Sequence, residues 1–423
     1  MGKTLAEKVL ARAGGEKEVS PGQIIEAEVD LAMTHDNNGP VMINQFNRLP
    51  GAKVWNPDRV VVIIDHHSPA TSFRAAENHR TLRKFAAKHE LKHFFDCGEG
   101  VSHVILRQKG FVKPGMVMVG SDSHSVAGGA LGAFATGIGA TEMAAVLARG
   151  KLWLRVPETV KITLHGRLPV GVMARDVALF LLGQFGPDGL DYKAVEVHGS
   201  GIKGWDIEER AALCTMGVEM GTKAMMVPAD EVTLVYAGVA QDLGYVPDLD
   251  AQYERDLQYD LGGLAPMVSK PFLPTNAVPV GEVLGTRIDQ GVIGSCAGGS
   301  LPDLEIAARI LEGKQVRKGV RLIITPSSKE NWIRADEKGL LKILKQAGAV
   351  VSSPACGACG GYEIGCLAPG EVCISTTTRN MPGRMGPGGE VYLASAATVA
   401  ASALAGEIVD PRPYLNERPA WVS

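Results

Sequence analysis

The sequence lacks the features of several protein classes. No apolar run approaches the roughly 20 residues that a membrane-spanning helix requires. Charge of one sign is also missing, because 43 lysine and arginine residues are balanced by 46 aspartate and glutamate residues. A broad basic face that would bind nucleic acid is therefore not expected. Internal repeats and low-complexity tracts are absent as well.

A disulfide framework is equally unexpected. The chain contains seven cysteines, an odd number, and shows no secretory segment. This pattern suits a reducing compartment, by default the cytoplasm. What the sequence does contain is 423 residues, 45% of them hydrophobic, enough to bury the cores of two to four domains.

Short runs rich in valine and isoleucine alternate with helical patterns, which is typical of α/β domains built on largely parallel sheets. Proline-containing stretches near 157–168 and 271–280 predict domain limits, so we expect three α/β domains over 1–160, 161–285 and 286–423. The expected strands are Val60–Ile64, Met116–Gly120, Val160–Leu164, Ala194–Val197, Leu322–Ile324 and Val350–Ser352. The expected helices are a short one at the N-terminus, Ser72–His89, Thr141–Trp153, Glu208–Gly221, Pro302–Leu311 and Val391–Ala405.

Polar residues follow three of these strands directly. The first strand leads into Asp65-His66, the second into Asp122 and His124, and a third ends at His198. Open α/β sheets bind ligands beyond the carboxyl ends of their strands. An aspartate beside a histidine orients and charges the imidazole, which gives a proton donor or relay near neutral pH. One such pair is more often structural, whereas two together indicate a catalytic site.

Three cysteines form the second candidate site. Cys296 lies in a Gly-Ser-Cys-Ala-Gly-Gly turn, and Cys356 and Cys359 form a Cys-Gly-Ala-Cys pair. Three thiolates suit an iron–sulfur cluster with one iron left open, which can act as a Lewis acid on a substrate oxygen. Glycines around the pair favour an open turn over the helix of a thioredoxin-like site and let backbone N–H groups approach cluster sulfides. The pattern therefore predicts chemistry on a hydroxyl or a carboxylate.

A zinc site is the competing interpretation of the cysteines. Cys366 and Cys373 could complete a closed, structural set of four thiolates with the Cys356 and Cys359 pair. A zinc-stabilised scaffold would leave the paired Asp-His strand ends unexplained. Without zinc, Cys97, Cys214, Cys366 and Cys373 are most simply small buried apolar residues.

Seven motifs are spread over nearly the whole chain: MTHDNNGP (33–40), IDHHSPA (64–70), GVSHVIL (100–106), GSDSHSVAGGALGAFATGIGATEM (120–143), GSCAGG (294–299), ACGACGG (355–361) and TRNMPGRMG (378–386). Together they resemble the aconitase superfamily, and specifically its 3-isopropylmalate dehydratase and homoaconitase large subunits. The resemblance implies three α/β/α domains around a 4Fe–4S cluster, with a fourth, mobile domain supplied in the same chain or as a separate small subunit.

The resemblance also implies roles for individual residues. Cys296, Cys356 and Cys359 would hold the cluster, and its open iron would bind substrate carboxylate and hydroxyl. His66, polarised by Asp65, would protonate the departing hydroxide. Four further residues would act around the same water, namely His103, Asp122, His124 and Glu219. The implied substrate-binding residues are His35, Ser123, Arg379 and Arg384; the forked guanidinium of arginine suits a carboxylate.

One part of such a site is not found in the sequence. In the family the serine that removes the Cα proton belongs to the fourth domain, and this sequence ends at Ser423 without it. We therefore expect the large subunit of a split hydro-lyase, inactive alone, that moves a hydroxyl between adjacent carbons of a hydroxy di- or tricarboxylate. The leading substrate is 3-isopropylmalate, and homoaconitate is second.

The sequence departs from the family pattern at several positions that should face the site. Ala297-Gly298 replaces Thr-Asn, Ser125 replaces Thr, Thr378 begins a Thr-Arg-Asn-Met segment in place of Asn-Arg-Asn-Phe, and Thr215 stands where an asparagine is found. Hydroxyls of Thr378 and Thr215 could still donate hydrogen bonds to cluster sulfides. These departures leave open a hydratase of another malate derivative, such as maleate, citraconate or a methyl-substituted malate. An RNA-binding iron sensor is a remote alternative, which the slightly acidic charge balance disfavours.

Overall fold

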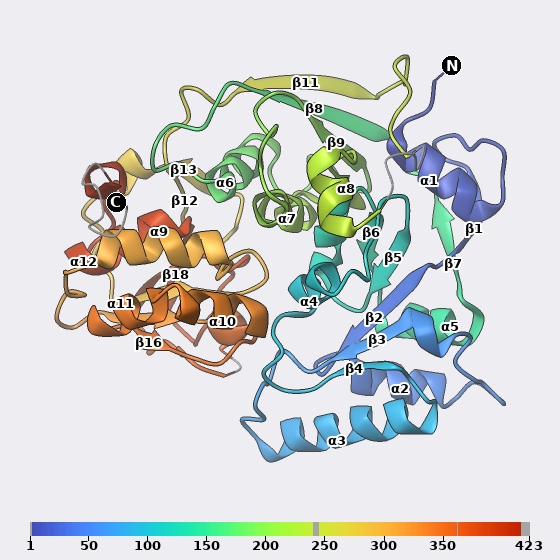
Figure 1. The fold of residues 1–423 in the computed structure, drawn as a ribbon, viewed down its shortest axis with the longest axis horizontal. Coiled ribbons are helices and arrows are strands. Elements are labelled where there is room, and N and C mark those ends of the chain that lie inside the picture. The colour runs from blue at the N-terminus through green and yellow to red at the C-terminus, as the bar shows by residue number, and fades with distance from the viewer. Residues whose placement is uncertain (1, 240–244, 362, 416–423) are drawn as a thin grey trace. The chain divides into compact units, whose positions relative to one another are not determined.

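The computed structural model describes residues 2–239, 245–361 and 363–415 (Figure 1). The chain divides into two compact units. Unit 1 comprises residues 1–97, 102–165 and 188–260, and unit 2 comprises residues 98–101, 166–187 and 261–423. Both units combine helices with mostly parallel sheets, which confirms the predicted fold class. The three-domain division stays a prediction.

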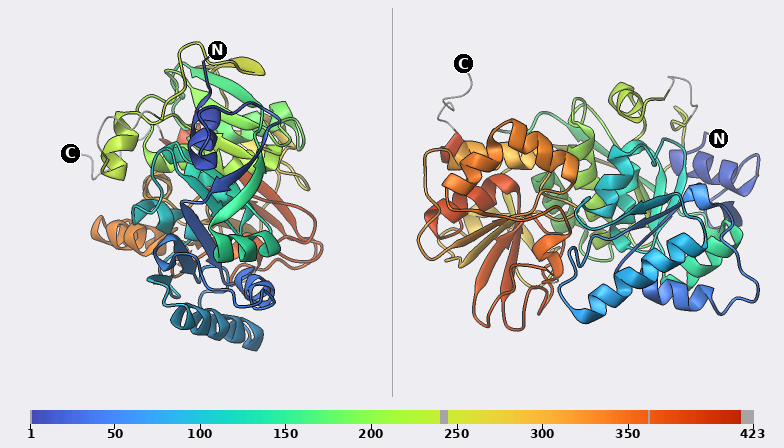
Figure 2. Two further views of the ribbon diagram at one scale, coloured as in Figure 1. Left: turned by 90° about the vertical axis from the view of Figure 1, so that its right-hand side faces the viewer. Right: turned by 60° about the horizontal axis from the view of Figure 1, so that its bottom comes forward.

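A five-stranded parallel sheet forms one part of unit 1, with strand order β4-β3-β2-β5-β6. Its strands are β2 (Leu31–His35), β3 (Val60–Ile63), β4 (His93–Phe95), β5 (Val117–Gly120) and β6 (Phe134–Gly137). The helices beside it are α2 (Gly39–Phe46), α3 (Phe73–Lys88), α4 (Ser102–Gln108) and α5 (Ala140–Arg149). In the right-hand view of Figure 2 the blue helices α2 and α3 lie along one side of these strands.

Strand β3 shows why this sheet is buried on both faces. Val60 and Val62 join a core that includes residues of α2, α3 and α5, whereas Val61 and Ile63 join a second core with residues of α4. Successive side chains of a strand point to opposite faces, so a strand with apolar residues at every position needs cover on both sides. The continuous Val-Val-Val-Ile run is the sequence signature of that arrangement.

The remainder of unit 1 contains a four-stranded parallel sheet and a two-stranded antiparallel ribbon. The sheet has the order β10-β9-β8-β11 and the ribbon pairs β1 with β7. The strands are β1 (Ile24–Glu28), β7 (Lys151–Arg155), β8 (Thr159–His165), β9 (Ala194–His198), β10 (Ala224–Met226) and β11 (Arg255–Asp260). The helices are α1 (Leu5–Gly14), α7 (Ile207–Thr215) and α8 (Glu231–Ala237), with 3₁₀ turns η1 (Pro57–Arg59), η2 (Ser123–Leu131) and η3 (Met216–Met220).

Unit 2 is built on a seven-stranded mixed sheet of order β13-β12-β18-β17-β14-β15-β16, in which β12 runs antiparallel to both neighbours. The strands are β12 (Met267–Ser269), β13 (Ala277–Pro279), β14 (Gln290–Ile293), β15 (Arg321–Ile324), β16 (Val350–Val351), β17 (Val372–Ser375) and β18 (Glu390–Ala394). The helices are α6 (Ala174–Phe185), α9 (Leu301–Leu311), α10 (Lys329–Glu337), α11 (Leu340–Gln346) and α12 (Ala396–Ala405). Three short 3₁₀ turns complete it, η4 (Val280–Glu282), η5 (Gly357–Gly360) and η6 (Arg412–Leu415). Within the described residues, no helix is both long and apolar enough to cross a membrane.

All six predicted strands are present, but two predicted helices are partly wrong. The helix predicted over Thr141–Trp153 ends at Arg149, because Gly150 adopts the left-handed conformation that terminates helices, and strand β7 follows. The segment Val391–Ala405 begins as strand β18, and helix α12 starts only after Ser395. The predicted helix Glu208–Gly221 is α-helical to Thr215 and continues as the 3₁₀ turn η3.

Candidate active site

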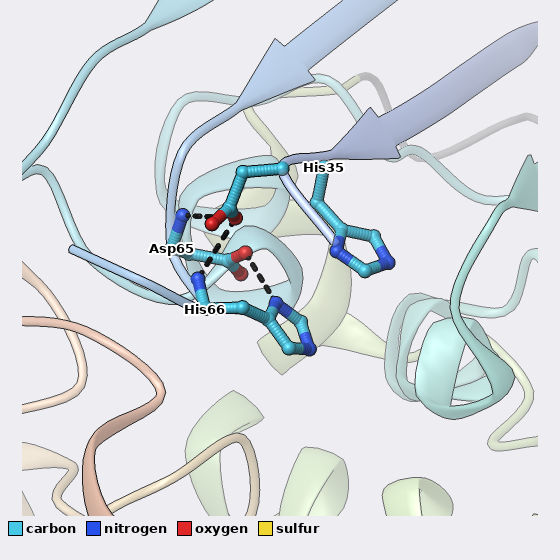
Figure 3. A group of neighbouring side chains, drawn as sticks. His35, Asp65 and His66 are labelled. Atoms are coloured by element: carbon cyan, nitrogen blue, oxygen red, sulfur yellow. Dashed lines mark hydrogen bonds and ion pairs between the residues drawn. The ribbon is translucent and has the colours of Figure 1, made fainter. Parts of the chain in front are cut away.

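The two Asp-His strand ends come together in unit 1. Strands β3, β2 and β5 are neighbours in a parallel sheet, so their carboxyl ends meet at one edge. Asp65 and His66 follow β3, His35 ends β2, and Asp122 follows β5. Figure 3 shows the side chains of His35, Asp65 and His66 gathered beyond the strand arrows. Two of the three polar strand ends named from the sequence thus lie together, whereas His198 ends β9 in the four-stranded sheet.

Asp122 lies at the centre of this group, within 4 Å of four histidine rings. Its carboxylate lies 2.9 Å from Nε2 of His103 and 3.6 Å from Nδ1 of His124, whose backbone N–H also donates to it at 2.8 Å. Nε2 of His66 lies 3.8 Å away and Nε2 of His35 lies 3.9 Å away. Burial would raise the pKa of Asp122, but hydrogen bonds from the His103 and His124 rings hold it well below its ordinary value. Four imidazoles therefore surround one ionised carboxylate.

Two carboxylates hold the His66 imidazole in its charged form. Its Nδ1 lies 2.7 Å from Oδ1 of Asp65, whose other oxygen accepts the backbone N–H of Ser102 at 2.7 Å. Burial would lower the pKa of His66, but the carboxylates of Asp65 and then Asp122 raise it to about 10. The ring of His35 stacks on that of His66 with centroids 4.2 Å apart, and burial and the charge of His66 lower the pKa of His35. One ring is thus cationic and its stacked neighbour neutral (Figure 3).

His124 and Glu219 form a second hydrogen-bonded pair. Nε2 of His124 lies 3.0 Å from Oε1 of Glu219, which comes from η3. Burial would lower the pKa of His124, but hydrogen bonds to Asp122 and Glu219 raise it. The predicted set Asp65, His66, His103, Asp122, His124 and Glu219 is thus one connected network. Ser123, also predicted, is the half-buried first residue of η2.

Two residues of this region were not singled out from the sequence. Asp36 is fully buried and accepts hydrogen bonds from the turn that carries His66. His79 of α3 lies 3.4 Å from the Asp36 carboxylate. Asp36 follows His35 at the end of β2, so a third His-Asp doublet at a strand end was the available signal. Nothing in the helical pattern around His79 marks it.

Four side chains, His35, Asp36, Asp65 and His66, lie with ligand atoms within 4.8 Å of one another, which is a spacing that could hold a metal ion. The Asp36 oxygens already accept three backbone N–H groups, and Asp65 already binds the His66 ring. A protonated imidazole is also no ligand. The arrangement therefore fits proton transfer better than metal binding.

The three cysteines lie in unit 2 and are all buried. Cys296 follows β14, while Cys356 and Cys359 lie at η5. Oγ of Ser295 lies 3.7 Å from the Cys296 sulfur. The Cys359 sulfur lies 3.9 Å from Oγ1 of Thr378 and accepts a hydrogen bond of 3.2 Å from Nη2 of Arg384.

Polar contacts make Cys359 acidic. A hydrogen bond from Cys356 and then the Arg384 guanidinium hold the pKa of the Cys359 thiol well below its ordinary value, against the opposing effect of burial. Thiolates are the form in which cysteines ligate iron and zinc. The backbone around them is also crowded: a Cβ on Gly357 would lie 2.7 Å from Oγ1 of Thr325, and one on Gly298 would lie 2.2 Å from Oγ1 of Thr376. The Gly298 departure from the family pattern is thus part of the local packing.

The structure disfavours the four-cysteine zinc site. Burial raises the pKa of the Cys373 thiol on β17 to about 12, and Cys366 is exposed with its sulfur 3.4 Å from the Gly361 carbonyl. Among the described cysteines, no three sulfurs lie within 4.8 Å of one another, as one zinc ion would need.

Arginines lie near these thiols, including one that the sequence did not reveal. Arg175, at the start of α6, is buried and donates a hydrogen bond to the Thr377 carbonyl. Burial lowers the pKa of Arg175 to about 10, while the thiols of Cys296 and Cys359 are among the groups that oppose this. Arg379 is half-buried. No motif surrounds Arg175, so only the fold identifies it.

One expectation about hydrogen bonds to cluster sulfides is corrected. Oγ1 of Thr215 donates to the Ala211 carbonyl of its own helix at 2.6 Å, so its single proton is already used. Thr378 remains suited to that role because its hydroxyl faces the Cys359 sulfur.

The fold, the buried imidazole–carboxylate network and the three buried thiols together define a class of protein. That class is an α/β enzyme whose thiols are suited to a metal cluster. The chain matches the model of the aconitase family (aconitate hydratase) over residues 7–286 and 281–406. The chain belongs to the aconitase family, as its motifs predicted.

Relatives of known name agree with this family. The chain is 51% identical to a 3-isopropylmalate dehydratase large subunit 1 of Methanopyrus kandleri, over 98% of this chain and 100% of the relative. It is 44% identical to a probable methanogen homoaconitase large subunit of Methanothermobacter thermautotrophicus, over 96% and 97% of the two chains. The crystal structure of holo aconitase X from Thermococcus kodakaraensis superposes with a TM-score of 0.51 at 15% identity, covering 93% of this chain and 90% of that one. That likeness shows the fold alone.

Proposed function

We propose that the chain is the large subunit of an iron–sulfur hydro-lyase that isomerises a hydroxy di- or tricarboxylate by dehydration and rehydration. The leading substrate pair is 2- and 3-isopropylmalate, with homoaconitate second, because relatives of both names are 44 to 51% identical to this chain. The observation that carries the reaction class is the imidazolium of His66, held by Asp65 and directed at Asp122.

The cofactor that we propose is a 4Fe–4S cluster held by Cys296, Cys356 and Cys359. Buried thiols with a lowered pKa at Cys359 fit such a group, because thiolates are the form in which cysteines bind iron. When bound, the cluster supplies a Lewis acid for a substrate oxygen. Thr378 and Arg384 contact the Cys359 sulfur and would hold it in place.

His66 supplies the proton that the reaction requires. Hydroxide is a poor leaving group, so a proton from Nε2 of His66 converts it to water as the C–O bond breaks. Nδ1 cannot serve, because Asp65 holds it. The proton on the adjacent carbon goes to a base that we assign to the small subunit. On rehydration a water molecule returns its proton to His66, and His103, Asp122, His124 and Glu219 order that water.

Substrate binding is assigned to residues with suitable donors. His35, neutral and stacked on His66, and Ser123 would contact a substrate carboxylate. Arg379 offers a guanidinium for a second carboxylate. Arg384 already donates to the Cys359 sulfur, so we give it a shared role, supporting the thiol as well as the substrate.

The proposed partner is a small subunit that carries a swivelling domain and the catalytic serine, in keeping with the words "large subunit" in the names of the relatives. The cytoplasmic localisation predicted from the cysteines remains a proposal.

The test uses the anaerobically reconstituted chain with its small subunit. We expect turnover of 3-isopropylmalate, a three-iron electron paramagnetic resonance signal after mild oxidation, and loss of that signal when ferrous iron and reductant are added. Cys296→Ser should abolish both cluster and turnover, whereas Cys366→Ser, at the exposed thiol that a zinc site would use, should alter neither. Stoichiometric zinc and a colourless protein would contradict the cofactor.

The same preparation decides between substrates. Isopropylmalate, homoaconitate, citraconate, maleate and methyl-substituted malates are compared by kcat/KM. Turnover of one of the last three alone would retain the reaction class and replace the proposed substrate.

A further inference from the structure

The carboxylate of Asp36 accepts hydrogen bonds from three backbone N–H groups. Its Oδ1 accepts the backbone N–H groups of Asp65 at 3.0 Å and His66 at 2.9 Å, and its Oδ2 accepts that of His67 at 2.8 Å. Three consecutive N–H groups thus converge on one fully buried side chain. Consecutive backbone N–H groups that point the same way form a nest for an anion, and here the anion is built into the chain.

A histidine of α3 faces the same carboxylate. Nε2 of His79 lies 3.4 Å from Oδ2 of Asp36, and both side chains are buried. Burial would raise the pKa of Asp36, but His79 and then the charges of His66 and His35 hold it well below its usual range. A buried carboxylate that keeps its charge needs such compensation.

We propose that Asp36 is a positioning residue, whose carboxylate fixes the backbone turn at 65–67 so that the His66 ring stays between Asp65 and Asp122. The inference rests on the proposed function, in which His66 is the acid. The turn follows β3 directly and no helix continues it, so its N–H groups need an acceptor from elsewhere. Asp36 supplies that acceptor from the neighbouring strand β2.

Unit 1 contains a matched control. Glu196 on β9 is also fully buried, and its carboxylate accepts the backbone N–H groups of Leu5 at 2.6 Å and Ala6 at 3.4 Å. Glu196 therefore accepts backbone N–H groups at the start of α1, as Asp36 does at the His66 turn. Glu196→Gln measures the cost of neutralising such a carboxylate without touching the His66 turn.

The test compares Asp36→Asn with Glu196→Gln in the full chain. An asparagine presents an NH₂ group where one oxygen stood, so it cannot accept all three N–H groups. The charged and titratable groups that face His66 are Asp65 beside it, His35 and Asp36 after β2, and Asp122 after β5. Imidazole ¹⁵N resonances are followed against pH in histidine-labelled protein, and the His66 signals are assigned from their loss in His66→Gln.

We expect Asp36→Asn to lower the apparent pKa of His66 by at least half a unit and to mix its tautomers above that pKa. With the small subunit present, kcat should fall 10- to 100-fold with little change in KM, because misplacement of a catalytic group costs rate. Glu196→Gln should lower the melting temperature and leave the His66 signals unchanged. His66 signals in Asp36→Asn that match the wild type would overturn the inference.

Asp36→Glu covers the case in which Asp36→Asn does not fold. It keeps the charge but advances the carboxylate by one methylene, so we expect displaced His66 signals and reduced kcat; wild-type signals and kcat would overturn the inference. The proposed function fails separately, since it falls if the wild-type pair turns over none of the acids, whatever the resonances show.

Discussion

At the scale of single residues, opposite charges in a buried network set the protonation of the candidate site. His66 is cationic because Asp65 and Asp122 outweigh its burial, whereas the adjacent His35 is neutral because burial prevails. The two rings are stacked 4.2 Å apart, but Asp65 binds only the His66 ring, and the charge of His66 lowers the pKa of His35 further. Protonation differences of this kind mark acid and base roles in enzymes.

The raised pKa of His66 predicts a pH dependence of stability. The folded value of about 10 exceeds the unfolded value of about 6.5, so between these values the folded state binds more protons. The contribution of His66 is therefore complete below about pH 6.5 and is lost as pH rises toward 10. Urea unfolding of the wild type and Asp65→Asn across this range measures it. We expect the difference in unfolding free energy to shrink with rising pH; a constant difference would contradict the assignment.

Arg175 predicts a property of the cluster rather than of the reaction. A buried guanidinium near the thiols of Cys296 and Cys359 favours the more negative, reduced state of a bound cluster. Arg175→Met should therefore lower the midpoint potential by tens of millivolts, since roughly 1 kcal/mol corresponds to about 40 mV for one electron. A redox titration followed by electron paramagnetic resonance measures it. Arg309→Gln, at a half-buried arginine of the same unit that also donates to a backbone carbonyl, is the control and should leave the potential unchanged.

At the scale of elements, strand ends and several helix ends, such as Leu311 and Ala405, were predictable, but the junctions between a helix and an adjoining strand were not. Asp65-His66 and Asp122 follow buried valine-rich strands, and parallel strands share the edge at which they end, so sequence order alone placed them together. The segment after Gly150 was misassigned because an apolar run fits a helix or a strand equally well. Asp36 and Arg175 escaped notice for another reason. Their partners are backbone groups and thiols distant in sequence, which no local pattern encodes.

Gly150 and Gly15 give a matched test of helix termination. Both end helices of unit 1 in the left-handed conformation, with φ of 70° and 67°. A Cβ on Gly15 meets nothing within 4 Å, but one on Gly150 would lie 2.4 Å from Cδ1 of Trp55. Gly15→Ala should cost about 1 to 2 kcal/mol from conformation alone. Gly150→Ala should cost about 1 to 3 kcal/mol more by overpacking. Equal losses in denaturant unfolding would refute the contact.

At the scale of the whole molecule, neither unit is a continuous stretch of chain. Unit 2 takes residues 98–101 and 166–187 from within the span of unit 1. Helix α6 contacts β12 and β13, Asp176 accepts the backbone N–H of Met267 at 2.8 Å, and Arg175 donates to the Thr377 carbonyl.

This interleaving predicts the behaviour of fragments. A chain of residues 261–423 lacks α6 and leaves the Met267 N–H without its carboxylate acceptor. We expect it to unfold without a cooperative transition, and addition of a 166–187 peptide to restore one. The same peptide with Asp176→Ala is the control and should restore less. Cooperative melting of the 261–423 fragment alone, followed by circular dichroism, would contradict this.

The exposure of Cys366 allows a spectroscopic probe to be attached at one site. It is the exposed thiol among seven described cysteines, and its sulfur lies 3.4 Å from the carbonyl of Gly361, which ends the turn that bears Cys359. A maleimide fluorophore or nitroxide would attach there first, since the other thiols are at least half covered. Its emission or line width would then report, in real time, changes in the surroundings of the cysteine turn while iron and sulfide are loaded.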